Sequence, residues 1–124
     1  MTQPLALVVY EKLLPGSQLV NRLQDLQYRV QTLGDASKLT ECAEQERPML
    51  VLVDLECTKA NVFDAIKRLR QTPNTQHLPV IGILSDKAIN LQESALSAGV
   101  TLVVNDVAIL NHLPQFLDQA LQVD

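Results

Sequence analysis

The sequence predicts an α/β domain in which one parallel sheet is covered by helices on both faces. Short aliphatic runs alternate along the 124-residue chain with stretches whose apolar residues recur every three or four positions, which is the spacing of one helix face. A helix between each strand and the next is the connection that parallel strands need. Because such crossovers are right-handed, the helices cover both faces of the sheet.

Five aliphatic runs predict the strands. In chain order they are residues 5–9, 28–32, 49–54, 80–84 and 101–104. The third run, MLVLVD, is the most apolar, as expected of a strand that is buried on both faces of a sheet. Its last residue is a carboxylate, Asp54, and a charge is costly to bury in the middle of such a strand.

Five helical stripes lie between and after these strands. They consist of Leu19, Val20, Leu23 and Leu26; Leu39, Cys42 and Ala43; Val62, Ala65, Ile66 and Leu69; Ile89, Gln92, Ala95, Leu96 and Ala98; and Leu113, Leu117, Ala120 and Leu121. Asp35 or Ser37 is expected to cap the second helix, and Gly99 to end the fourth. Pro114 is expected in the first turn of the fifth helix, after Asn111 or His112 as its cap.

Together these elements predict a flavodoxin-like (βα)5 fold with strand order 2-1-3-4-5. Hydrophobic residues make up 47% of the chain and charged residues 19%, which is the balance of a globular protein. The length is that of one domain. Residues 1–124 are therefore expected to form a single domain, with no output domain after the fifth helix.

Composition excludes several classes of partner. The net charge is −4 and no block of Lys and Arg exists, so nucleic acid is not an expected partner. No apolar run approaches the length of a membrane span, and the first residues do not form a signal peptide, so no membrane attachment is expected. Cys42 and Cys57 lack the spacing of a metal site or a disulfide framework, which predicts free thiols in a reducing cytoplasm.

Candidate functional residues follow the strands. In an open parallel sheet, ligands bind at the carboxyl ends of the strands, beside the point where the strand order reverses. Here that point lies between the first and third strands. The residues at these strand ends are Tyr10, Glu11 and Lys12; Asp54, Leu55 and Glu56; Leu84, Ser85 and Asp86; and Asn105 and Asp106. Asp54 is thus expected in a functional crevice rather than in the core.

Four segments carry a resemblance to a known family. They are LALVVYEK, VLVDLE, FDAIKRLR and HLPVIGILSDKAINLQESALSAGV. In their order and spacing the chain resembles, over essentially its whole length, the receiver domain of bacterial response regulators. The resemblance implies a role in two-component (phosphorelay) signal transduction, with Asp54 as the phospho-acceptor and a histidine kinase or a downstream signalling protein as partner.

The family pattern is incomplete on the metal side. Receivers carry two acids after the first strand, which hold Mg²⁺. This chain has Tyr10 and Glu11 there, so the resemblance leaves Glu11 and Asp54 as a weak or absent Mg²⁺ site. Glu56 stands where the family uses a backbone carbonyl on the metal, and its side chain is not a required ligand.

The phosphoryl side also departs from the pattern. The family's hydroxyl after the fourth strand aligns with Leu84, and Ser85, one residue later, would point to the other face of the strand. The family's lysine after the fifth strand aligns with Asp106. Replacing a lysine by an aspartate changes the local charge by two units, which at an effective dielectric of ~20 amounts to several kcal/mol close to a phosphoryl group. Tyr10, Leu84 and Asp106 are therefore the departures that matter most.

Three hypotheses follow. The first is a degenerate receiver, or pseudo-receiver, that acts by protein contact through the face formed in this family by the fourth helix, fifth strand and fifth helix. On that face the chain offers Ile89, Gln92, Val103, Ile109 and Leu110. The second is a single-domain receiver phosphorylated on Asp54, with Mg²⁺ held by Glu11 and Asp54.

For Asp54 itself, a plain structural role also stays open, as a strand-end residue that caps backbone amides of the next loop.

The third hypothesis, a small cofactor carrier on the same fold, has the least support. The segment YEKLLPGS has no run of small residues directly after the first strand, as a flavin carrier needs. His77 and His112 lie far from the loop in which a cobalamin domain keeps its ligand. An enzyme is not expected, because the chain has no P-loop pattern and no Ser or Cys spaced to pair with either histidine.

Overall fold

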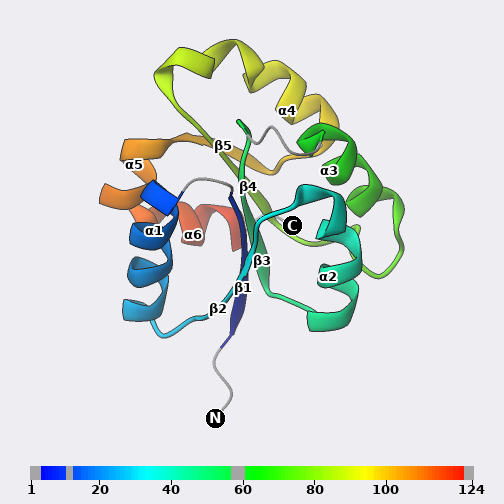
Figure 1. The fold of residues 1–124 in the computed structure, drawn as a ribbon, viewed down its shortest axis with the longest axis horizontal. Helices are drawn as coiled ribbons and strands as arrows, with labels where there is room; N and C mark the ends of the chain where they lie inside the picture. Colours follow the sequence, from blue (N-terminus) through cyan, green and yellow to red (C-terminus); the bar gives the residue numbers. More distant parts are fainter. Residues whose placement is uncertain (1–3, 11–12, 57–60, 122–124) are drawn as a thin grey trace.

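The computed structural model contains one five-stranded parallel sheet of order β2-β1-β3-β4-β5, as the sequence predicts (Figure 1). The structure describes residues 4–10, 13–56 and 61–121. The strands are β1 (Leu5–Val9), β2 (Arg29–Leu33), β3 (Leu50–Asp54), β4 (Val80–Leu84) and β5 (Leu102–Asn105). The flavodoxin-like topology is therefore confirmed, with β3 at the centre of the sheet.

The second strand begins one residue later than the sequence suggests. Tyr28 is still part of the turn that ends the preceding helix, because its N–H donates to the carbonyl of Leu23 at 3.1 Å. Gln27, just before it, has a left-handed backbone with φ of 72°. The chain becomes extended only after this turn, so β2 starts at Arg29.

Helices fill the connections between the strands. They are α1 (Leu13–Asp25), the 3₁₀ turn η1 (Ala36–Lys38), α2 (Leu39–Glu46), α3 (Val62–Gln71), the 3₁₀ segment η2 (Asp86–Leu91), α4 (Gln92–Ala98), α5 (Asp106–Asn111) and α6 (Leu113–Leu121). Among the described residues, none of these helices has the length and apolar character that a membrane span requires.

The prediction of one helix after the last strand is wrong. A short helix, α5, begins at Asp106 directly after β5, and the chain leaves helical geometry at His112 before α6 begins. Pro114 explains the break, since a proline has no N–H to donate to the carbonyl four residues earlier, that of Leu110, and its ring crowds that carbonyl. Pro114 lies in the first turn of α6, where the sequence placed it.

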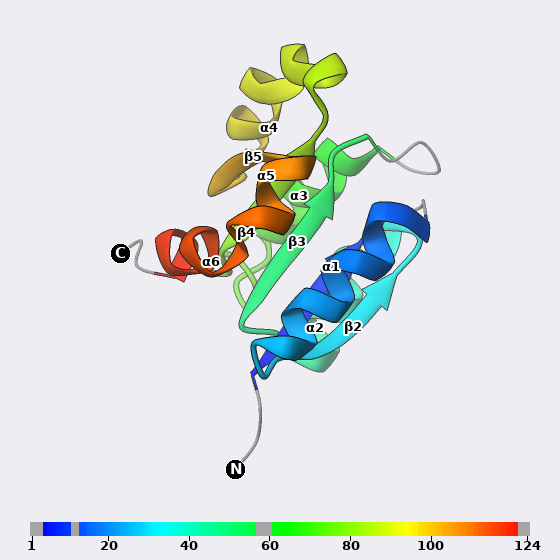
Figure 2. The ribbon, with the colours of Figure 1, turned by 90° about the vertical axis from the view of Figure 1, so that its left-hand side faces the viewer.

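The helices form one layer on each face of the sheet (Figures 1 and 2). Helices α2, α3 and α4 cover the face that carries Val51 and Val53, and helices α1, α5 and α6 cover the face that carries Leu50 and Leu52. Side chains alternate between faces along a strand. Asp54, two residues after Leu52, therefore lies on the α1 and α5 side of the sheet.

The predicted stripe of the fourth helix is only partly correct. Ala95 and Ala98 are buried, but Ile89 and Leu96 are 58% and 49% exposed, and Gln92 is exposed as well. Ile89 lies in the 3₁₀ segment η2, which has three residues per turn, so its spacing to the residues of α4 is not that of a single α-helix. Ile109 is predicted to lie on a contact face, but it is buried, with 1% of its surface exposed.

Arg70 ties the end of α3 to two later turns. Its Nε donates to the carbonyl of Gly99 at 2.8 Å, its Nη1 to those of Gln76 and Leu78 at 2.7 and 2.6 Å, and its Nη2 to the hydroxyl of Thr101 at 3.1 Å. Burial lowers the pKa of Arg70 from its ordinary value. Gly99 ends α4 as predicted, with φ of +117°, and a Cβ there would lie 2.6 Å from Cγ of Arg70.

We expect Arg70→Ala to lower the free energy of unfolding by about 2–3 kcal/mol, because partly buried carbonyl groups lose a charged donor. Urea denaturation measures the change. Arg68→Ala, an exposed position on the same helix, is the matched control and should cost less than about 0.5 kcal/mol. Equal costs for the two variants would show that the Arg70 contacts do not stabilise the fold.

Candidate functional site

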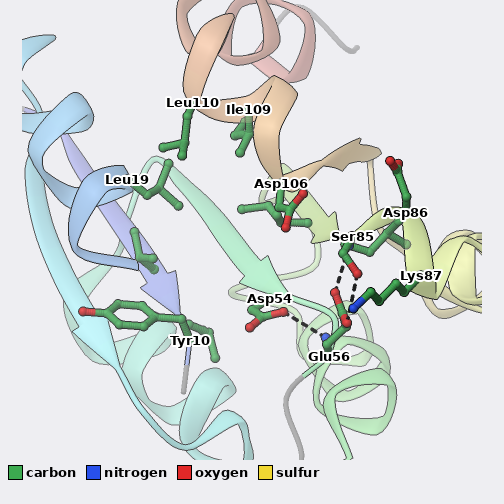
Figure 3. Close-up of a pocket in the computed structure, with 14 residues that line it drawn as sticks. Tyr10, Leu19, Asp54, Glu56, Ser85, Asp86, Lys87, Asp106, Ile109 and Leu110 are labelled. Carbon is green, nitrogen blue, oxygen red and sulfur yellow. Dashed lines mark hydrogen bonds between the residues drawn. The ribbon is translucent and has the colours of Figure 1, made fainter. Parts of the chain in front are cut away.

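A cavity of about 470 Å³ opens at the carboxyl ends of the strands (Figure 3). It lies at the predicted crevice and is bordered by α1 and α5. Its apolar lining consists of Val8, Val9, Leu19, Ile83, Leu84, Ile109 and Leu110, and its polar lining of Tyr10, Asp54, Glu56, Ser85, Asp86, Lys87 and Asp106. Strands β1, β3 and β4 and helix α5 thus bring together most of the candidates that the sequence selects.

Asp54 is the last residue of β3 and is half-buried in this cavity. Its Oδ1 accepts the N–H of Glu56 at 3.0 Å. The next residue, Leu55, still donates its N–H to the carbonyl of Ile83 at 2.8 Å. The main-chain N–H groups of Leu55 and Glu56 are therefore both hydrogen-bonded. The predicted hydrogen bond from a backbone N–H of the next loop to the Asp54 carboxylate is therefore present, and the carboxylate faces the cavity.

Glu56 and Ser85 form the second polar contact. Oε2 of Glu56 accepts the N–H of Ser85 at 2.8 Å, and Oε1 accepts the Ser85 hydroxyl at 3.2 Å (Figure 3). Ser85 does point away from the face of Leu84, but that side is the one on which Asp54 lies. Ser85 therefore lines the cavity, as the sequence predicts for the residues that follow the fourth strand.

A third contact joins the end of β4 to the start of α5. The side-chain amide of Asn105 donates to Oδ1 of Asp86 at 2.6 Å. Its carbonyl oxygen accepts the N–H groups of Val107 and Ala108 at 2.8 and 3.2 Å, which caps α5. Asp106 is the first residue of α5, where a carboxylate is favoured by the orphan N–H groups of the first turn.

The described lining of the cavity is strongly anionic. It contains four carboxylates, those of Asp54, Glu56, Asp86 and Asp106, and one cation, Lys87. Lys87 is exposed, and its side chain extends toward the Glu56 side of the cavity (Figure 3). Like charges in one cleft raise the cost of bringing in a further anion.

Comparison with known proteins gives a match of fold. No protein-family model matches the chain, and no curated protein matches it in sequence. Among solved structures, the receiver domain of a sensor histidine kinase from Pseudomonas aeruginosa, with a magnesium ion coordinated in its active-site cleft, has a TM-score of 0.88 at 20% identity and covers 98% of this chain and 100% of its own.

Two further structures agree. The chemotaxis protein CheY4 of Vibrio cholerae has a TM-score of 0.85 at 17% identity over 96% of this chain and 99% of its own. The response regulator domain of CheB from Thermotoga maritima has a TM-score of 0.80 at 18% identity over 99% of both chains. The chain has the receiver-domain fold.

Tyr10, Leu84 and Asp106, the three positions at which the sequence is expected to depart from the receiver pattern, all line the cavity. Leu84 is 2% exposed and packs in the core while bordering the cavity. The ring of Tyr10 points away from Asp54 in Figure 3. Asp106 presents its carboxylate to the cavity from the start of α5, across from Asp54 (Figure 3). That these three residues replace the hydroxyl, acid and lysine of the family stays a prediction from the sequence resemblance.

The residues of a Mg²⁺ site are only partly described. Glu11 lies outside the described residues, as do Lys12 and Cys57. Within residues 4–10, 13–56 and 61–121, no three His, Cys, Asp or Glu side chains gather as a metal-binding group. Of the two proposed ligands, the structure therefore places Asp54 at the cavity and leaves the pairing with Glu11 a prediction.

Sequence reasoning missed the roles of Glu56 and Asn105. The Asn-Asp pair after the last strand, followed by apolar residues, is the usual start of a helix, so the cap of α5 was detectable. The contact of Glu56 with Ser85 joins residues 29 apart in sequence and had no local signal.

We expect Asn105→Ala to lower the free energy of unfolding by about 1 kcal/mol, because α5 loses its cap and Asp86 loses a donor. Thermal unfolding followed by circular dichroism measures the loss. Asn90→Ala, at an exposed position of η2, is the control and should change stability by less than about 0.5 kcal/mol. A loss no greater than in the control would contradict the capping role.

Proposed function

We propose that the chain is a receiver-like module of two-component signal transduction that acts mainly by protein contact, in the cytoplasm and without enzymatic activity of its own. The receiver-domain fold supports the signalling class. The observation that carries the finer proposal is the lining of the cavity around Asp54, which includes Leu84 and the carboxylate of Asp106. By the sequence resemblance, these two residues align with the family's hydroxyl and lysine.

Phosphoryl transfer depends on cations and donors placed around the group that is transferred. A lysine at position 106 would attract a phosphoryl group, whereas the carboxylate of Asp106 repels it. At an effective dielectric of ~20, two unit charges ~4 Å apart interact by about 4 kcal/mol, so the reversal disfavours a dianion on Asp54 by several kcal/mol. Leu84 offers no donor to compensate.

Exposed apolar side chains support a contact role. Ile89, Leu96 and Val107 are 58%, 49% and 62% exposed, and they lie on η2, α4 and α5. Val103 on β5 is half-exposed. These elements form the predicted contact face, for which a histidine kinase or a downstream signalling protein is the partner class that we propose.

A working receiver phosphorylated on Asp54 is the second candidate. It is favoured by the position of Asp54 at the end of β3 with its carboxylate on the cavity. It would need Mg²⁺ held by Asp54 and Glu11, and a magnesium ion is present in the cleft of the Pseudomonas aeruginosa receiver domain.

Incubation with acetyl phosphate and Mg²⁺ separates the two candidates. We expect no mass increase of the intact protein, because Leu84 and Asp106 stand where the resemblance places the hydroxyl and the lysine that stabilise the transferred group. A receiver domain that carries both groups serves as the positive control in the same buffer. A stoichiometric adduct that disappears in Asp54→Asn would refute the proposal and establish the second candidate.

We expect Ile89→Asp and Val107→Asp to change the free energy of unfolding by less than about 0.5–1 kcal/mol, because both side chains are largely exposed. Ile109→Asp, which buries a carboxylate beside β4 and β5, should cost more than about 3 kcal/mol. Urea denaturation compares the three. A large loss in the first two variants would assign these residues to the core rather than to a contact face.

A further inference from the structure

Ser85 presents two hydrogen-bond donors to the cavity, and both are already in use. Its N–H and its hydroxyl converge on the two oxygens of the Glu56 carboxylate, at 2.8 and 3.2 Å. A pair of donors from the backbone and the side chain of one residue is an arrangement that binds the two oxygens of a carboxylate or phosphoryl group. Here the group that the two donors bind is the carboxylate of Glu56, a residue of the same chain.

The position of Glu56 is held at its other end as well. Its own N–H donates to Oδ1 of Asp54 at 3.0 Å, so the residue is fixed through its main chain at β3 and through its side chain at the end of β4 (Figure 3). A tethered carboxylate competes against free ligands with an effective concentration on the order of millimolar or more. An external oxyanion must therefore displace Glu56 before it can reach Ser85.

We propose that Ser85 forms an oxyanion-binding site and that Glu56 is its built-in occupant, an autoinhibitory contact that closes the cavity to external carboxylate and phosphoryl groups. The inference deepens the proposed function, on which it rests, since it names a second reason for the cavity to reject phosphoryl groups besides the charge of Asp106. The inference also explains why both carboxylate oxygens of Glu56 contact Ser85 although the cleft already contains Asp54 and Asp106.

The test removes the built-in ligand and offers a small external one. In Glu56→Ala the two donors of Ser85 are released, and sodium acetate supplies the missing carboxylate. We expect the amide resonance of Ser85 in ¹H–¹⁵N spectra to shift in a saturable way, with an affinity at least about tenfold higher than in the unmodified protein, since a charge-assisted hydrogen bond is worth more than about 1.4 kcal/mol. Sodium chloride at equal ionic strength controls for screening.

Two results would overturn the inference. One is a Ser85 amide that responds to acetate as strongly in the unmodified protein as in Glu56→Ala. The other is a variant that folds but shows no saturable shift. Glu44→Ala, which removes an exposed carboxylate on α2 far from the cavity, is the matched charge control and should behave as the unmodified protein.

A second variant keeps the inference testable if Glu56→Ala does not fold. Glu56→Gln retains the shape and one acceptor oxygen but loses the charge, so exchange of the Ser85 amide with solvent deuterium should become about tenfold faster. Unchanged exchange would overturn the assignment of Glu56. Neither readout involves phosphorylation: an acetyl phosphate adduct would refute the proposed function, while the role of Glu56 would still be judged by the Ser85 amide.

Discussion

The parallel pairing of β3 with β1 on one side and β4 on the other is the constraint on which the rest of the structure depends. Residues 50–53 are fully buried by this pairing, and the helices then have two apolar faces to cover. The same pairing brings the carboxyl ends of β1, β3 and β4 to one edge. Asp54 is the first residue of β3 that this edge exposes.

The elements at that edge are joined by side chains rather than by extended loops. Glu56 joins the end of β3 to the end of β4, and Asn105 joins η2 to the start of α5 through Asp86. In each case an acidic oxygen accepts from an amide or hydroxyl group, so no lysine or metal ion is needed to hold the two contacts together. At this edge the carboxylates of Glu56 and Asp86 thus accept hydrogen bonds from other residues of the same chain.

These contacts at the sheet edge are separate from those that hold the fold together. The fold depends on the buried strands and on contacts such as those of Arg70 with the turns before β4 and β5, none of which involves Asp54. Tyr10, Leu84 and Asp106 line the cavity, and the charge and hydrogen-bond donors at these positions do not enter the packing of the buried strands β1 and β3.

The sequence by itself determined the strand order and the place of Asp54 at the end of β3, because aliphatic runs and spacing are local and repeat in every βα unit. The limits of α5 and α6 depended on a break at His112, and the exposure of Ile89 depended on the 3₁₀ segment η2, neither of which periodicity encodes. Only the tertiary structure decided that Glu56 reaches Ser85, since that contact requires two strand ends to lie side by side in the sheet. The hydrophobic pattern of one segment does not specify how far that segment lies from another in space. The shape and lining of the cavity depend on such distances.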